Sequence, residues 1–177
     1  MELFWEKGFH ATSMQDLVSH LGINRASLYD TYGGKEALFE KAFAHYRKSA
    51  IDSLQKLFDK ELSVKSGFKR LFDLAIEEDV CDTSGKGCFV VNTITELIPG
   101  NDTLLDILAS HKKEIESLFV NFVQRGIDNG EISNSKNANE IGLMLFTLYN
   151  GIRVISKVNP NRKKLQKVVN AGLSVLD

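Results

Sequence analysis

The stretch that decides the fold reads TSMQDLVSHLGINRASLYDTY and covers residues 12–32. Leu17 and Leu21 stand among apolar residues at helical spacing, which indicates a short helix that ends at Gly22. Asn24 can cap a second helix over residues 25–32, which two glycines follow. Two short helices joined by a glycine-containing turn are the parts of a helix-turn-helix, whose second helix lies in the major groove of DNA.

The start of the first of these helices has its own signal. Thr12, followed three residues later by Gln15, fits a capping box, in which a side chain at each end satisfies a free backbone amide of the other. We therefore expect Thr12 to be the N-cap residue.

The side chains of the second helix suit contact with DNA. Arg25 can donate two hydrogen bonds to a guanine edge, Ser27 can reach either kind of base edge, and the Ala26 methyl group can meet a thymine methyl. Hydroxyl and amine donors nearby suit phosphates, which position a protein without reading sequence. For Arg25, a phosphate contact is almost as good an interpretation as a base contact. The predicted DNA-contacting residues are Thr12, Ser13, Asn24, Arg25, Ala26, Ser27, Tyr29, Thr31 and Lys35.

Charge gives this interpretation no help. The net charge of the chain is −1, and residues 1–48 hold six acidic and six basic side chains. A basic patch is the usual electrostatic sign of a DNA-binding protein. The prediction therefore depends on the motif and its spacing.

The rest of the chain has the pattern of long helices. Helical apolar spacing starts at residue 35 and continues for more than six turns, and further helices are expected over about 66–80, 87–98, 102–129 and 137–155, with a last one after Pro160. No alternation with period two occurs, so we predict an all-α chain of about nine helices. Residues 1–45 would form a three-helix DNA-binding domain and residues 46–177 a helical domain.

Residues 8–39, GFHATSMQDLVSHLGINRASLYDTYGGKEALF, resemble the DNA-binding domain of the TetR (tetracycline repressor-like) family of bacterial regulators. The matching elements are Gly8-Phe9, Thr12-Ser13, the Gly22 turn, Ser27-Leu28-Tyr29, Tyr32 and Lys35-Glu36. The resemblance implies a homodimer that binds a pseudo-palindromic operator, usually as a repressor, and leaves the DNA when a small molecule binds the C-terminal domain. Family members usually begin earlier, with a basic arm and a full first helix, so we expect a shortened first helix here.

Two further sets of residues are predicted within the C-terminal domain. The faces expected to line an effector pocket carry few charges, which favours an uncharged or weakly polar effector. The helix over 137–155 and the last helix after Pro160 would form a four-helix interface with a second subunit, because the first of them is apolar on nearly all sides. The pocket residues are Phe72, Cys88, Phe89, Thr93, Leu97, Leu118 and Phe122. The interface residues are Leu145, Leu148, Ile152, Ile155, Val168, Val169 and Leu173.

Cys88 has two interpretations. A thiol at a helix N-terminus has a lowered pKa and could sense oxidants or electrophiles. The simpler interpretation, which we favour, is that Cys88 is a small buried apolar residue.

Other function classes find little in the sequence. The histidines and cysteines lack metal-ligand spacing, and no nucleophile, base and acid stand together, so we expect no metal, no cofactor and no enzyme. No secretion signal or membrane-spanning run is present, which favours a cytoplasmic protein. The alternative to a regulator is a dimeric helical adaptor or ligand-binding protein that has lost DNA binding.

Overall fold

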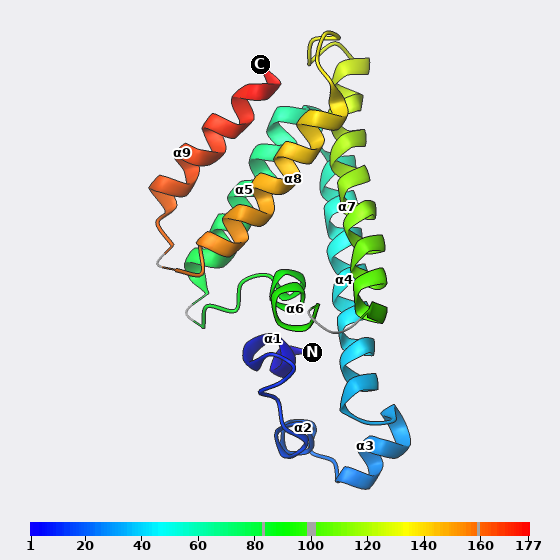
Figure 1. Ribbon diagram of the computed structural model, residues 1–177. Helices are drawn as coiled ribbons and strands as arrows, with labels where there is room; N and C mark the ends of the chain where they lie inside the picture. Colours follow the sequence, from blue (N-terminus) through cyan, green and yellow to red (C-terminus); the bar gives the residue numbers. More distant parts are fainter. Residues whose placement is uncertain (83, 99–101, 159) are drawn as a thin grey trace.

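The computed structural model describes residues 1–82, 84–98, 102–158 and 160–177, and every regular element in these segments is a helix (Figure 1). This confirms the all-α prediction. No helix in the described segments has both the length and the apolar character of a membrane span. The helices are α1 (Glu2–Lys7), α2 (Met14–Leu21), α3 (Arg25–Tyr32), α4 (Lys35–Lys60), α5 (Val64–Cys81), α6 (Phe89–Leu97), α7 (Asp102–Asp128), α8 (Ala138–Ile155), α9 (Arg162–Leu173) and the 3₁₀ turn η1 (Ser174–Leu176).

Helix α2 begins one residue later than its capping signal suggested. Ser13 is the N-cap: its Oγ accepts a hydrogen bond from the Asp16 amide at 3.0 Å, and the Asp16 carboxylate accepts one from the Ser13 amide at 2.9 Å. Thr12 is fully buried, and its hydroxyl donates to the Gly8 carbonyl oxygen at 2.6 Å. The prediction of Thr12 as N-cap is therefore wrong, because Ser-x-x-Asp outcompetes Thr-x-x-Gln for the same turn.

Helix α3 has the predicted ends. The Asn24 side chain accepts a hydrogen bond from the Ser27 amide at 2.8 Å, and Gly33 ends the helix with φ of 85°. That left-handed conformation favours glycine, because a Cβ would clash with the backbone. Gly34, with φ of 124°, then turns the chain into α4, which runs from the helix-turn-helix up through the rest of the molecule (Figure 1).

Two apolar cores hold the structure. The larger one fills the C-terminal helices, where α7 packs along α8 and α5 packs along α9 (Figure 1). At Gly142 of α8, helix α7 approaches so closely that a Cβ on Gly142 would lie 2.7 Å from the Cα of Val120.

The second core joins α1, α2, α3 and α4 to α6 and α7. Its N-terminal part includes Phe4 of α1 and Phe39 of α4, whose rings meet edge to face with centroids 5.3 Å apart. Phe89 of α6 meets Phe39 in the same way at 6.0 Å, and Leu104 and Leu108 of α7 complete the cluster. The helix-turn-helix therefore shares its core with helices far along the chain.

Candidate nucleic-acid interface and ligand cavity

The outer face of α3 presents a group of unburied side chains. Arg25, Ala26, Tyr29 and Thr31 are exposed, whereas Leu28 is completely buried and fixes the helix on its neighbours. The Arg25 guanidinium carbon lies 5.8 Å from the centre of the Tyr29 ring, one turn further along. The two side chains form one surface that can bind a base edge or a phosphate.

Several other predicted DNA-contacting residues have structural roles. The burial of Thr12 removes its side chain from any phosphate, which corrects that prediction. The Ser13 hydroxyl both accepts from the Asp16 amide and donates to the Asp16 carboxylate at 2.6 Å, so the capping box already uses it. Asn24 caps α3, and Ser27 is half-buried. The Lys35 ammonium lies 4.4 Å from the centre of the Phe9 ring, close to the start of α4.

A charged contact fastens α1 to α2. Lys7 Nζ lies 2.7 Å from Asp16 Oδ1. Hydrogen bonds from Lys7 and from Ser13 hold the pKa of Asp16 well below its ordinary value. Asp16 therefore stays ionised at the N-terminus of α2, where the helix dipole also favours a negative charge.

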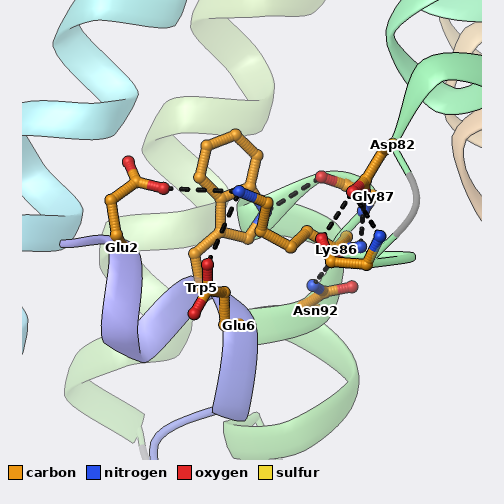
Figure 2. A network of polar contacts seen from close by, with 8 residues as sticks. Glu2, Trp5, Glu6, Asp82, Lys86, Gly87 and Asn92 are labelled. Carbon is orange, nitrogen blue, oxygen red and sulfur yellow. Dashed lines mark hydrogen bonds and ion pairs between the residues drawn. The ribbon is translucent and has the colours of Figure 1, made fainter.

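Polar contacts join α1 to the segment before α6 (Figure 2). The Trp5 indole Nε1 donates to the Gly87 carbonyl oxygen at 2.9 Å. Lys86 Nζ lies 3.5 Å from a Glu2 carboxylate oxygen and 3.8 Å from one of Glu6, beside the Trp5 ring (Figure 2). Asp82 holds this segment in place, because its carboxylate accepts the Lys86 amide at 2.6 Å.

A second contact joins α6 to the turn between α1 and α2. The Glu96 carboxylate accepts the Phe9 amide at 3.0 Å with one oxygen and the His10 amide at 2.7 Å with the other. The turn approaches so closely that a Cβ at Gly8 would lie 2.8 Å from Glu96 Oε2. One side chain of α6 thus satisfies two backbone donors of the turn between α1 and α2.

A cavity of about 980 Å³ lies among α4, α5, α6, α7 and α8. Most of its wall is hydrocarbon, from side chains such as Leu54, Leu71, Ile115 and Val91. Trp5, from α1, also lines it. The cavity therefore extends from the C-terminal helices to α1.

Only Cys88 among the seven predicted pocket residues lines this cavity. The other six lie on faces that the cavity does not reach, because helical spacing shows that a face is apolar and not which helix covers it. Phe72 and Phe122 are buried in the larger core, and Leu118 packs against it. Phe89 and Leu97 belong to the second core, and Thr93 is buried on α6.

The charged lining residues are paired. Arg153 is only 4% exposed, and its guanidinium lies 2.9 Å from Asp79 and 3.1 Å from Glu78. Ser156 donates a hydrogen bond to the other Asp79 oxygen. Burial, with the nearby Arg47 guanidinium, lowers the pKa of His111 to about 4, so its imidazole is neutral near pH 7.

The two cysteines differ in their surroundings. Cys88 is half-buried, precedes α6 as its N-cap residue and lines the cavity. Cys81 is exposed, and its thiol donates to Glu77, a contact that raises the pKa of Cys81. Within the described segments, no group of His, Cys, Asp and Glu side chains is arranged to hold a metal ion.

The predicted dimer residues divide into two groups. Leu145, Ile152, Val169 and Leu173 are buried in the chain's own core, so they are unavailable to a second subunit and that part of the prediction is corrected. Ile155 is 65% exposed and Val168 is 49% exposed. Leu148 is half-buried. On α8 the predicted stripe is therefore divided, since its own neighbouring helices cover Leu145 and Ile152 and leave Ile155 outside.

Sequence reasoning missed Glu96, Lys86 and Arg153. Each contacts a partner more than seventy residues away in the sequence, and no local spacing of residues predicts such a contact. Trp5 was missed as well, although its half-buried indole joins the network and the cavity.

Two family models match the chain. One, described as bacterial regulatory proteins of the tetR family, matches residues 1–42. The other, described as the tetracyclin repressor-like C-terminal domain, matches residues 71–171. Together they cover the helix-turn-helix and most of the C-terminal helices.

Relatives match over nearly the full chain. The uncharacterized HTH-type transcriptional regulator YezE of Bacillus subtilis is 32% identical over 178 residues, which cover 100% of this chain and 92% of that protein. The HTH-type transcriptional repressor ComR of Escherichia coli is 26% identical, over 98% of this chain and 83% of that protein.

Solved structures share the fold. A cysteine mutant of the TetR family transcriptional regulator CifR, complexed with 26bp double-strand operator DNA, superposes with a TM-score of 0.86, at 27% identity over 99% of this chain and 92% of that one. The reduced form of E. coli NemR reaches the same TM-score at 14% identity, over 99% and 92% of the two chains, which shows likeness of fold alone. With both family models and a full-length relative in agreement, this chain belongs to the TetR family of bacterial transcriptional regulators.

Proposed function

We propose that the chain is a repressor that binds a pseudo-palindromic operator as a homodimer and leaves it when a small molecule fills the cavity. The observation that carries the proposal is the exposed Arg25–Tyr29 surface on the second helix of a helix-turn-helix. The DNA-binding unit would comprise residues 1–45 and the ligand-binding and dimerising unit residues 46–177. Such a regulator works in the cytoplasm, where the chromosome is, and we assign it no enzymatic activity.

The exposed residues of α3 would divide the work of DNA contact. Arg25 and Ala26 would face base edges, and Tyr29 and Thr31 would donate to phosphates. Lys35 would supply a cation to the same phosphate backbone from the start of α4. Asp30, exposed on this helix, would face away from the phosphates, which would repel it.

The second subunit would cover the outward surface of α8 and α9. Met144, Leu148 and Ile155 follow one another at helical spacing along α8, Val158 lies just after its end, and Val168 lies on α9. Such exposed apolar surface on neighbouring helices favours an interface between copies. The dimer would place two copies of α3 on one face of the DNA, about one helical turn or a multiple apart.

Release follows if the ligand binds better to a conformation in which the two α3 helices are wrongly spaced. The cavity touches α4, which continues into the helix-turn-helix, and α6, which holds the α1–α2 turn through Glu96. A ligand that shifts either helix would therefore shift α3.

The direct test is binding of the purified protein to DNA from upstream of its own gene, across a range of salt concentrations. Wild-type protein should bind one site, and its affinity for that site should fall steeply as the salt concentration rises. R25A should relax base preference, whereas K35A should weaken binding to all sequences alike and lower the salt slope by about 1. K113A, an exposed lysine of α7 far from α3 in the sequence, serves as the matched control and should bind like wild type. Wild-type protein that binds the upstream DNA no better than random DNA would overturn the proposal.

A further inference from the structure

The cavity has a wall that crosses between the two units of the chain. Trp5 of α1 lines it together with Tyr46 of α4 and Cys88 at the start of α6. The Trp5 and Tyr46 rings meet edge to face with centroids 5.1 Å apart. Any molecule that fills this end of the cavity therefore contacts the first helix of the DNA-binding unit.

The rim of the cavity exposes apolar side chains to water. Leu74, Ile94 and Leu105 all line the cavity, and they are 48%, 41% and 47% exposed. Exposed apolar side chains that line one cavity are typical of a binding site for an apolar molecule. Their burial under a bound apolar molecule would remove apolar surface from water and so stabilise the complex.

The charges on the described lining residues are already compensated. Arg153 is paired with Asp79 and Glu78, and Lys112 lies 3.3 Å from Glu116 on the next turn of α7. The remaining polar side chains include neutral hydroxyl groups, such as those of Ser49, Ser53 and Thr147. A charged ligand would lose its hydration here without gaining a free counter-charge, so a neutral ligand of the same size should bind more tightly.

We propose that the cavity binds an uncharged, predominantly apolar molecule that lies against Trp5, with a neutral hydrogen-bonding group such as a ketone or a hydroxyl. This deepens the proposed function and rests on it, since the same cavity would hold the effector. The paired charges exclude fatty acids and cationic amphiphiles as preferred ligands. The position of Trp5 makes α1 a direct contact of the bound molecule.

Trp5 is the only tryptophan in the chain, so its fluorescence reports on the cavity without labelling. The probes are 2-decanone, decanoate and decylammonium, which share a chain length and differ in charge, each used below its micelle concentration. Cyclododecanone adds a neutral probe of another shape. The neutral probes should change the Trp5 emission saturably, and the two ions should bind at least tenfold more weakly. Equal or tighter binding of either ion would overturn the inference, and so would the absence of any Trp5 response to both neutral probes.

A charge placed inside the cavity gives a second measurement. Ala50 is a half-buried lining residue of α4, and Ala44 is an exposed residue of the same helix that does not line the cavity. A50E should weaken the binding of 2-decanone at least tenfold and raise the affinity for decylammonium relative to that for 2-decanone. A44E should bind all the probes like wild type. If A50E fails to fold, I94K on the rim should shift preference toward decanoate in the same way. Unchanged affinities in a folded variant would contradict the inference.

These measurements use no DNA, so they separate the ligand class from the proposed release. Adding 2-decanone to the complex of protein and operator tests the release on its own. Neutral probes that bind at Trp5 without releasing DNA would count against the proposed release, and the ligand class would stand.

Discussion

The indole Nε1 of Trp5 donates a hydrogen bond to the backbone carbonyl of Gly87 at 2.9 Å, which ties α1 to the segment that leads into α6. Lys86, the residue before, lies over the same ring at 5.2 Å from its centre (Figure 2). Asn92 of α6 continues the network, because its side chain donates to the Lys86 carbonyl oxygen at 2.7 Å and accepts from Lys157 at 2.8 Å. A path of direct contacts thus runs from the end of α8 to α1.

Replacing Trp5 with phenylalanine tests that path. W5F keeps an aromatic ring but loses the donor, so the free energy of unfolding should fall by about 1 kcal/mol. The operator affinity lost on adding 2-decanone should be about fivefold smaller in W5F, because part of the coupling passes through this bond. Chemical denaturation and fluorescence anisotropy of labelled operator measure the two effects. An unchanged release by 2-decanone would show that the coupling runs elsewhere.

His111 should make stability depend on pH. Its pKa is about 4 in the folded chain, because of burial and Arg47, and its ordinary value is 6.5. Between these values the unfolded chain binds more protons, so stability should fall as pH drops from 6.5 toward 4, by at most about 3 kcal/mol, and should not change through His111 above that window. H111Q should flatten this part of the profile, as measured by urea unfolding at several pH values. H45Q, at an exposed histidine of α4, is the control. An H111Q profile that matches wild type would refute this explanation.

Two glycines of α8 should respond oppositely to alanine. A Cβ at Gly142 would lie 2.7 Å from the Val120 Cα and 2.9 Å from its amide nitrogen, and backbone atoms cannot move aside cheaply. G142A should therefore lose about 1–3 kcal/mol of unfolding free energy. At Gly151 nothing lies within 4 Å of a Cβ, so G151A should keep or slightly raise the stability of the helix. Thermal melts of both variants decide the matter, and equal losses would contradict the close packing of α7 on α8.

Ile155 should matter for assembly and not for folding. It is 65% exposed at the end of α8, so I155E should leave the helical content unchanged while the proposed dimer dissociates. Sedimentation and light scattering at several concentrations measure the change. L62E, at a residue that is 94% exposed between α4 and α5, is the matched control and should assemble like wild type. A dimeric I155E protein would place the interface elsewhere.

The sequence predicted best what local chemistry decides. The bounds of α3 follow from Asn24 and Gly33, which act within one turn of the helix. The start of α2 was missed by one residue, because Thr12 and Ser13 both carry a suitable hydroxyl and the capping box of Ser13 with Asp16 decides between them.

The cavity and the outward face of α8 were less predictable, for one physical reason. An apolar helix face can be covered by a neighbour, by a ligand or by a second subunit, and spacing alone does not separate these outcomes. Phe72 and Phe122 meet other helices, whereas Leu74, two residues from Phe72, faces the cavity. Which of these side chains faces a helix and which faces the cavity depends on the rotation of α5 relative to α7. The local sequence contains no pattern that predicts this rotation.

The two hydrogen bonds that Glu96 accepts from the backbone amides of Phe9 and His10 bear on the design of hybrid regulators. A chimera in which residues 1–45 come from another regulator would have a different turn between α1 and α2. The residue that accepts hydrogen bonds from this turn, Glu96, would still be the host's, because it lies on α6. Every protein that supplies a DNA-binding unit has backbone amides in this turn. A host protein that keeps Glu96 can therefore be combined with many DNA-binding units, provided that glycine is retained at position 8. Hosts that lack a carboxylate at this position would leave two amides without a partner, and swapped domains would then lose their alignment with the effector unit.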